Sequence, residues 1–587
     1  MKNSKLILIV VLFLNCHLFF GQSILEKGTN IVNYQKLKYA RTNQEFGKIS
    51  LIENPNSEFG TLQIETKKRP KFIYNASTSI PLKKQKLKKG QVVLFSFKGI
   101  TIKSGLETGE ARFLCVLRQS NSYKGNIEET VSLATEWKTY YIPFELTQDI
   151  SADDLGMALQ FGFQPQIALF DDVNFLVFKK GTALADLPKT KIKYVGMEEN
   201  APWRKLAEKR IATHRKTDFK VNFVKDGKPL KNKMVQLKLV NHEFSWGVTL
   251  NANDVLKDDN QLKYASKGFN EVVFANDLKI KNWKRPKNRE RTIAAIQKII
   301  EKNLQLKGHV LIWPGFQYQN QEIRNLEGKP ELLSKKIKQH VLDISKQTKG
   351  KISHWDVVNE AYTNTDFQRI TGSEEILYEG FRTMRKQQPN VGRFTNEYGI
   401  ISKGGIDTQK QQWYYDYIKR IDANTNNAVD GIGIQCHIGS DLTPPARVVE
   451  ILDFYGRLKK KISISEFTME TRDDEIREKY TADFITAVFS HPNVSEFLFW
   501  GFHESGNPKA IIHNKDWSLA PMGKAFYDLV HSKWKTNFNQ KTSNTGNVKG
   551  NGFYGTYEYS FLDGKTLKKG KFKILKGRVT NMKIQIK

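Results

Sequence analysis

From residue 244 onward, short apolar runs alternate with longer segments in which apolar residues recur every three or four positions. The short runs are typical of buried parallel strands, and the longer segments are typical of amphipathic helices. Eight short runs are present, at residues 245–250, 271–276, 308–313, 354–360, 392–398, 431–437, 461–466 and 497–502. Helical segments lie between them, for example at residues 292–302, 332–348, 376–388 and 410–423. Eight strand–helix units over about 300 residues predict a (β/α)8 barrel.

The pattern is different on either side of the predicted barrel. Residues 23–182 contain short alternating runs with turns between them, which predicts a β-sandwich. This part resembles secreted carbohydrate-binding jelly rolls, whose last strand often carries an Asp-Asp-Val like that at residues 171–173. Past residue 535 the helical pattern stops and alternation returns. We hypothesise that this tail pairs with a hairpin at residues 219–240 to form a small β layer beside the barrel.

The first residues differ again. Lys2 and Lys5 precede an apolar run at residues 6–20, and small and polar residues follow it. This predicts a cleaved secretory signal peptide, because the run is short for a membrane helix. Cys16 raises the alternative of a lipid anchor, but Asn15 before it is too large and polar for the usual cleavage motif.

We therefore expect a multidomain protein, secreted to the periplasm or the cell exterior, monomeric and without stable membrane insertion. Its expected parts are a signal peptide (1–22), a β-sandwich (23–182), a linker (183–200), a barrel (201–535) and a C-terminal β segment (536–587).

The formal charge of +32 indicates either attraction to an acidic polymer or a lysine-rich solvated surface. The lysines are spread along the chain, and no nucleic-acid-binding module is visible, so we expect no nucleic-acid partner. Of the three cysteines, one lies in the predicted signal. Cys115 and Cys436 lie in different predicted domains, so we expect no disulfide between them.

Two of the predicted strands end in glutamates. The run Trp355-Asp356-Val357-Val358-Asn359-Glu360 stops abruptly at Glu360, and a second run ends at Glu466. The carboxyl ends of the strands of a parallel barrel form one catalytic face. Two glutamates at that face suggest an acid and a nucleophile for glycosidic bond cleavage.

At these residues the chain resembles glycoside hydrolase family 10, the retaining endo-β-1,4-xylanases, over residues 203–534. The resemblance implies Glu360 as the acid/base and Glu466 as the nucleophile, with neither cofactor nor metal. It also implies substrate-binding and supporting residues on the other strand ends. The implied substrate-binding residues are Asn276, Lys279, His309, Trp313, Asn359, Gln435, His437 and Trp500, and the implied supporting residues are Asn396 and Tyr398.

Three departures from the family pattern concern the substrate. Ala275 stands where the family usually has Glu, and Pro314 stands where it usually has His. The loop with His503 and Asn507 lacks a second tryptophan that normally shapes the cleft. We expect a more open cleft and a xylan substrate, with glucuronoxylan favoured by the basic surface.

Two alternatives remain open at this point. One keeps the two-glutamate mechanism and changes the substrate to another β-glycan, as Ala275 and the altered loop suggest. The other is a catalytically idle glycan-binding protein on a hydrolase scaffold, against which the presence of both Glu360 and Glu466 argues.

Overall fold

The computed structural model describes residues 24–55, 57, 59–105, 109–119, 125–439, 441–471, 473–578 and 581–586. The predicted signal peptide at residues 1–22 lies outside these described residues. The chain forms two compact units. One comprises residues 1–193 with 439–442, and the other comprises residues 194–438 with 443–587. In the described part of the chain, no helix combines the length and apolar character needed to cross a membrane.

The N-terminal unit is a sandwich of two antiparallel sheets. One sheet has the order β2-β3-β10-β5-β8, with β1 beside β10, and the other has the order β4-β9-β6-β7. The strand bounds are β1 (Thr29–Asn30), β2 (Gly47–Ile52), β3 (Thr61–Thr66), β4 (Ser77–Ile80), β5 (Val92–Ser104), β6 (Ala111–Gln119), β7 (Gly125–Leu133), β8 (Lys138–Glu145), β9 (Leu155–Gln160) and β10 (Gln166–Val177). A short helix, α2 (Tyr34–Leu37), follows β1. The predicted β-sandwich is present.

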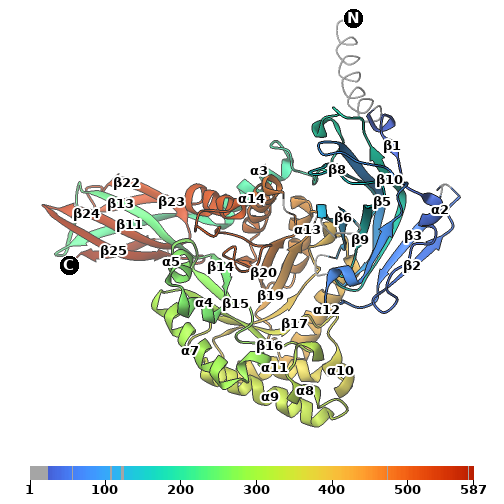
Figure 1. Ribbon diagram of the computed structural model, residues 1–587. Coiled ribbons are helices and arrows are strands. Elements are labelled where there is room, and N and C mark those ends of the chain that lie inside the picture. The colour runs from blue at the N-terminus through green and yellow to red at the C-terminus, as the bar shows by residue number, and fades with distance from the viewer. Residues whose placement is uncertain are drawn as a thin grey trace, which may run out of the picture. The chain divides into compact units, whose positions relative to one another are not determined.

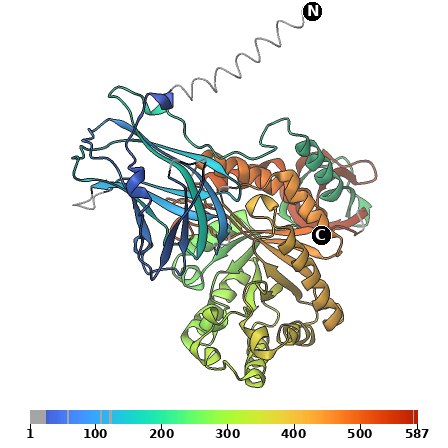
Figure 2. The same ribbon diagram turned by 90° about the vertical axis from the view of Figure 1, so that its right-hand side faces the viewer.

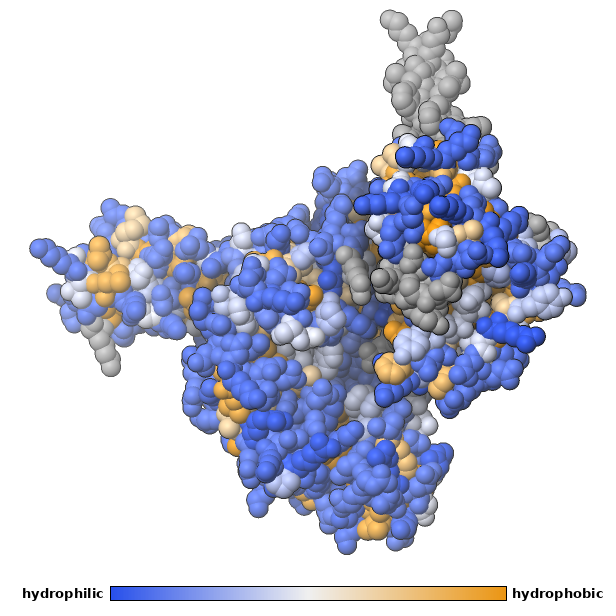
Figure 3. Space-filling view, viewed as in Figure 1, coloured by the Kyte–Doolittle hydropathy of each residue, from blue (hydrophilic) through white to orange (hydrophobic). Residues whose placement is uncertain are grey.

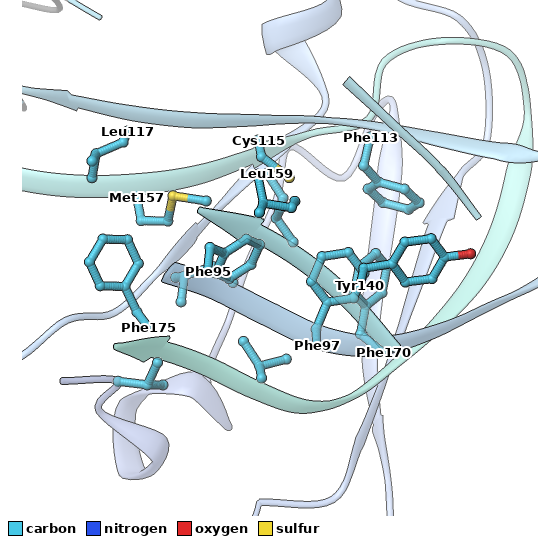
Figure 4. Close-up of a cluster of buried hydrophobic side chains, with 14 of the residues drawn as sticks. Phe95, Phe97, Phe113, Cys115, Leu117, Tyr140, Met157, Leu159, Phe170 and Phe175 are labelled. Atoms are coloured by element: carbon cyan, nitrogen blue, oxygen red, sulfur yellow. The ribbon is translucent and has the colours of Figure 1, made fainter. Parts of the chain in front are cut away.

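Aromatic side chains fill the space between the two sheets (Figure 4). Phe170 lies 4.9 Å from Phe97 and 4.6 Å from Phe113, measured between ring centroids. All three side chains are fully buried, and Cys115 lies in the same cluster as a free thiol. Cys436 is also buried, with a free thiol. The sandwich is stabilised by an apolar core.

The second unit contains a closed barrel of eight parallel strands, β14 to β21 (Figures 1 and 2). The strand bounds are β14 (Ser245–Leu250), β15 (Glu271–Phe274), β16 (Gln305–Ile312), β17 (His354–Asn359), β18 (Gly392–Glu397), β19 (Gly431–Ile438), β20 (Lys461–Met469) and β21 (Val494–Phe499). The predicted (β/α)8 barrel is therefore confirmed. Five of the eight strands end one to three residues earlier than the sequence predicted, whereas β19 and β20 end later, at Ile438 and Met469.

Helices follow each strand, except that the last strand leads through a long loop to its helix. Their bounds are α4 (Ala252–Lys257), α5 (Asp259–Gly268), α6 (Ile280–Trp283), α7 (Pro286–Glu301), α8 (Gln321–Arg324), α9 (Pro330–Gln347), α10 (Asp366–Thr371), α11 (Glu375–Gln387), α12 (Thr408–Thr425), α13 (Pro445–Gly456), α14 (Asp474–Ser490) and α15 (Pro521–Tyr527). Before the barrel, α3 (Pro202–His214) packs against α14. Figure 3 shows that polar side chains dominate the visible surface of this unit.

Close approach of backbone and side chains fixes the strands that carry the site. The Trp355 side chain is fully buried and lies against Gly308 of the neighbouring strand. A Cβ atom at residue 308 would lie 2.2 Å from the Trp355 ring, which explains why glycine occupies this position.

A small β layer lies beside the barrel within the same unit (Figure 1). Its strands are β11 (Lys216–Lys225), β12 (Lys228–Pro229), β13 (Met234–His242), β22 (Asn537–Lys541), β23 (Asn547–Phe553), β24 (Gly555–Asp563), β25 (Thr566–Ile574) and β26 (Asn581–Ile586). They form two sheets. β11 pairs with β12 across the Asp226-Gly227 turn and with β23 and β26 of the tail, whereas β13 lies in the other sheet and pairs with β22 and β24 of the tail. The hypothesis that the tail pairs with residues 219–240 is confirmed, but β11 and β13 do not form a hairpin with each other.

Candidate active site

The two glutamates singled out in the sequence lie toward the carboxyl ends of two barrel strands, β17 and β20. Glu360 follows β17 directly, and Glu466 lies within β20, near its end. Both side chains are almost completely buried, with exposed fractions of 4% and 5%. The polar groups around each carboxylate therefore determine its chemistry.

Glu360 has a backbone conformation that is unusual for a residue with a side chain. Its φ is +55°, and its N–H donates to the Asn396 carbonyl at 2.8 Å. This left-handed conformation costs free energy, and it directs the carboxyl away from the strand. One carboxyl oxygen, Oε1, accepts hydrogen bonds from Asn359 at 3.0 Å and Gln435 at 3.1 Å. The other, Oε2, accepts from Trp313 Nε1 at 3.1 Å and Asn364 at 3.3 Å.

Glu466 is held by two different partners. Its Oε1 accepts a hydrogen bond from Asn396 Nδ2 at 2.9 Å. Its Oε2 lies 3.4 Å from His437 Nε2, and the other ring nitrogen of His437 lies 3.0 Å from Thr468 Oγ1. The ring is thereby oriented toward the carboxylate.

The electrostatic environment favours the ionised form of Glu466. Burial raises the pKa of this carboxyl, but the hydrogen bond and charge of His437 lower it. The charges of His309 and Lys279 lower it further, and the net shift of the pKa is downward. Glu466 is therefore suited to act as an anion.

Two amides connect the carboxylates. Asn359 donates to Glu360, and its Oδ1 accepts from Asn396 Nδ2 at 2.9 Å. Asn396 Nδ2 also donates to Glu466, while Asn396 Oδ1 accepts from Ser465 at 2.6 Å. The chain of contacts from Glu360 through Asn359 and Asn396 to Glu466 places the two carboxylates around one site.

His309 contacts a buried pair of charged residues, Asp356 and Lys307, through Asp356. Its Nδ1 lies 2.9 Å from Asp356 Oδ2, and Asp356 lies 3.3 Å from Lys307 Nζ. Burial raises the pKa of Asp356, but the charge of Lys307 and the contact with His309 give a net lowering. The ring of His309 lies 5.1 Å from the ring of Trp500.

The predicted binding residues on the other side of the site also lie together. Lys279 Nζ donates to Asn276 Oδ1 at 3.0 Å and lies 4.6 Å from the centre of the Trp313 ring. Tyr318 stacks on Trp313 with 3.4 Å between ring centroids. Trp313 thus combines an aromatic face beside Lys279 with an N–H that holds Glu360.

Tyr398 is half-buried and lies beside the buried residues Lys410 and Glu397. Its hydroxyl donates to Thr363 Oγ1 at 3.2 Å, and Lys410 Nζ lies 3.5 Å from the centre of its ring. Lys410 also lies 3.0 Å from Glu397, whose pKa is raised by burial. This group supports the loops that follow β17 and β18.

The loop after β21 contains His503 and Asn507 where a second tryptophan would normally shape the cleft. Asn507 donates its side-chain N–H to the Trp500 carbonyl at 2.6 Å. The His503 ring packs on Trp517 at 4.4 Å, and Trp517 stacks on Tyr264 at 4.6 Å. Asn507 thus stabilises the loop itself, and the packing of Trp517 against His503 was not anticipated from the sequence.

Several residues of the site were not anticipated. Asn364 follows Glu360 by one helical turn, but no strand-end motif contains it. Lys307 and Asp356 are buried charged residues on two adjacent barrel strands, β16 and β17. In the sequence, the only indication was a charged residue within a strand that is otherwise mostly apolar. Lys307 is 1% exposed and Asp356 is 1% exposed. A buried charge in an apolar run is therefore a usable indicator of a partner on the next strand.

Comparison with known proteins shows which proteins this region is similar to. Residues 236–510 match the model described as glycosyl hydrolase family 10. The chain is 28% identical over 367 residues to "Anti-sigma-I factor RsgI6" of Acetivibrio thermocellus, covering 60% of this chain and 46% of that protein. It is 26% identical over 352 residues to "Endo-1,4-beta-xylanase 1" of Arabidopsis thaliana, covering 58% of this chain and 36% of that protein.

One solved structure found by comparison is xylanase 10B from Thermotoga petrophila RKU-1 in complex with xylobiose. It is 22% identical with a TM-score of 0.45, covering 50% of this chain and 95% of that chain. The present chain spans less than half the length of the two curated relatives named above.

Proposed function

We propose that this chain, whose residues 236–510 form a glycosyl hydrolase family 10 domain, is a secreted retaining endo-1,4-β-xylanase. The observation that carries the proposal is the pair Glu360 and Glu466, joined through the amides of Asn359 and Asn396. Retaining hydrolysis requires one carboxyl that gives and takes a proton and a second that attacks as an anion. The two glutamates have different partners, as such a division of roles requires.

In the first step, Glu466 attacks the anomeric carbon and the glycosidic bond breaks. The lowered pKa of Glu466 keeps it ionised, and Asn396 and His437 hold its two oxygens. Glu360 donates its proton to the departing glycosidic oxygen, so that the leaving group departs as a neutral alcohol.

In the second step, Glu360 acts as a base. It removes a proton from water as the water oxygen attacks the anomeric carbon of the glycosyl–enzyme ester. The bond to Glu466 breaks, and the nucleophile and the protonated acid are both restored. No cofactor takes part in these steps.

The proposed substrate is xylan, including forms that carry uronic acid. Lys279, Asn276 and Trp313 lie together beside Glu360 and offer hydrogen bonds and an aromatic face to a sugar. Ala275 removes a carboxylate that could bond the same sugar. A charge-assisted hydrogen bond contributes about 1.5–3 kcal/mol, so binding there should be weaker than in relatives with Glu.

The proposal extends to the rest of the chain. The apolar run at residues 6–20 supports secretion, and the jelly-roll-like sandwich supports glycan binding by the N-terminal unit. We further propose that the protein acts as a monomer.

A binding role without catalysis is the competing function. It is favoured by one observation, namely that a relative matching 60% of this chain is named an anti-sigma factor. Another β-glycan remains the alternative substrate, because Ala275 and the loop with His503 depart from the family pattern.

Product analysis on xylans, mixed-linkage glucans and cellulose separates these possibilities. Release of xylo-oligosaccharides supports the proposal, whereas products from the glucans alone would change the substrate. Binding to xylan without products would indicate the idle protein. Proton NMR during hydrolysis then tests the mechanism, since a retaining enzyme first releases the β-anomer.

A further inference from the structure

Three potential metal ligands meet at the end of the barrel opposite the catalytic glutamates. Glu271 begins β15, His354 begins β17, and Glu496 lies near the start of β21. Potential ligand atoms of all three lie within 4.8 Å of one another. His354 Nε2 lies 2.8 Å from Glu496 Oε2, and His354 Nδ1 lies 3.6 Å from Glu271 Oε1. No other group of this kind was found among the residues that the structure describes.

A buried oxygen in this group lacks a partner. Glu271 is fully buried, and its Oε1 accepts a hydrogen bond from Ser353 Oγ at 3.1 Å. Its Oε2 has no hydrogen-bond partner among the described residues. A buried oxygen without a hydrogen-bond partner is costly, so this atom is available to a ligand.

Carboxylates are concentrated in this layer. Lys307 Nζ lies 3.3 Å from Asp356 and 3.4 Å from Glu496, and all three side chains are buried. With Glu271, three carboxylates face the ammonium of Lys307 and the imidazole of His354. A cation bound between Glu271 and Glu496 would be stabilised by the two carboxylates.

We propose that Glu271, His354 and Glu496 form a structural site for a divalent transition metal such as Zn²⁺. One imidazole and two carboxylates suit Zn²⁺ and related metals, whereas Mg²⁺ and Ca²⁺ prefer oxygen ligands alone. Lys307 pairs with Glu496 through Oε1, which leaves Glu496 Oε2, the atom beside His354, for the metal.

The surroundings indicate how a metal would enter. A cavity of about 800 Å³ is lined by Ser353, His354 and Glu496 and can supply water to the remaining coordination positions. Arg393 and Lys461 line the same cavity, so a free cation should enter slowly. The site lies at the end of the barrel where residues serve stability, so the metal should stabilise the fold without taking part in turnover.

The test uses the full mature chain without a histidine tag, after dialysis against a chelator. Overnight incubation with Zn²⁺ should load one ion per chain, as measured by elemental analysis after desalting. The melting temperature should rise by roughly 3–6 °C at a hundredfold excess over Kd. Co²⁺ should give a visible absorption band, because His354 and the carboxylates would hold it in a low-symmetry site.

Glu271→Gln should abolish both the thermal shift and the Co²⁺ band. Glu243→Gln is the matched control, because Glu243 lines the same cavity but is exposed, and it should leave both unchanged. If Glu271→Gln does not fold, His354→Gln provides the same comparison. The proposal is overturned if the wild-type chain shows neither the thermal shift nor the Co²⁺ band, because water would then be the partner of Glu271 Oε2. It is also overturned if Glu271→Gln keeps both signals.

Discussion

The two ends of the barrel use the same acidic residue type in opposite ways. At the carboxyl end, Glu360 is held by amide and indole N–H groups, and Glu466 by an amide and an imidazole. At the other end, Glu496 contacts the ammonium of Lys307 and the ring of His354. The mostly neutral donors at the carboxyl end fix the orientation of each carboxylate and leave it able to react. At the opposite end, charged partners compensate the negative charge of Glu496.

The difference shows which interactions serve chemistry and which serve the fold. Lys307 and Asp356 connect the two ends, because Asp356 contacts both Lys307 and His309. Because the two glutamates of the carboxyl end carry the proposed chemistry, substitutions there should mainly lower the rate of hydrolysis. Substitutions among the buried charges of the opposite end should mainly lower the free energy of unfolding.

The largest effect should come from the nucleophile. Glu466→Ala should lower kcat by about 10⁴-fold or more, because no other carboxylate can form the covalent intermediate. The melting temperature should change little. Added azide should restore part of the activity, and Glu450→Ala, an exposed glutamate of the same unit, is the control. Wild-type activity in Glu466→Ala would show that the nucleophile is assigned wrongly.

The acid/base should show a dependence on the leaving group. Glu360→Ala should lower the rate about 10²–10⁴-fold on xylan, whose leaving group needs a proton. An aryl glycoside with an acidic phenol should form the covalent intermediate more nearly at the wild-type rate, so that its hydrolysis limits turnover. Equal losses with both substrates would contradict the acid role.

At the opposite end, the removal of a buried cation should destabilise the fold. Lys307→Met would leave Asp356 and Glu496 without their ammonium partner, at a cost of about 3–5 kcal/mol in the free energy of unfolding. Chemical denaturation measures this loss, and Lys298→Met is an exposed control. Unchanged stability would remove the contrast between the two ends.

A smaller change should appear in the pH profile of His437→Gln. His437 lowers the pKa of Glu466, so its loss should raise that pKa. A group with a depressed pKa is ionised above that pKa and protonated as the pH falls through it. The acidic limb of kcat/KM should therefore move to higher pH, while activity at neutral pH falls less. An unmoved limb would assign it to another group.

The smallest expected effect is that added salt changes the rate of hydrolysis more than it changes the melting temperature. Glucuronoxylan should be hydrolysed faster than its uronate-reduced form at low salt, and the difference should shrink as ions screen the basic surface. The melting temperature should respond less, because buried pairs are screened weakly. Equal rates at low salt would indicate that the charge of +32 reflects only a lysine-rich solvated surface.

The sequence by itself determined the architecture of the barrel and the identity of its two central glutamates. Period-two and period-3.6 patterns are local consequences of burial, so eight strands and their helices could be predicted. The position of Glu360 directly after a strand followed from the same pattern, whereas β20 continues three residues beyond Glu466. The motif Trp355 to Glu360 then fixed the family resemblance.

The tertiary structure alone decided which side chains face one another. The amide connection from Asn359 to Asn396 and the support of His309 by Asp356 depend on how neighbouring strands are staggered, and the hydrogen bond from Asn364 depends on the turn after β17. No metal site was expected from the sequence, because the three candidate ligands are far apart along the chain. Barrel closure brings Glu271, His354 and Glu496 into one layer, since β15, β17 and β21 surround the same interior.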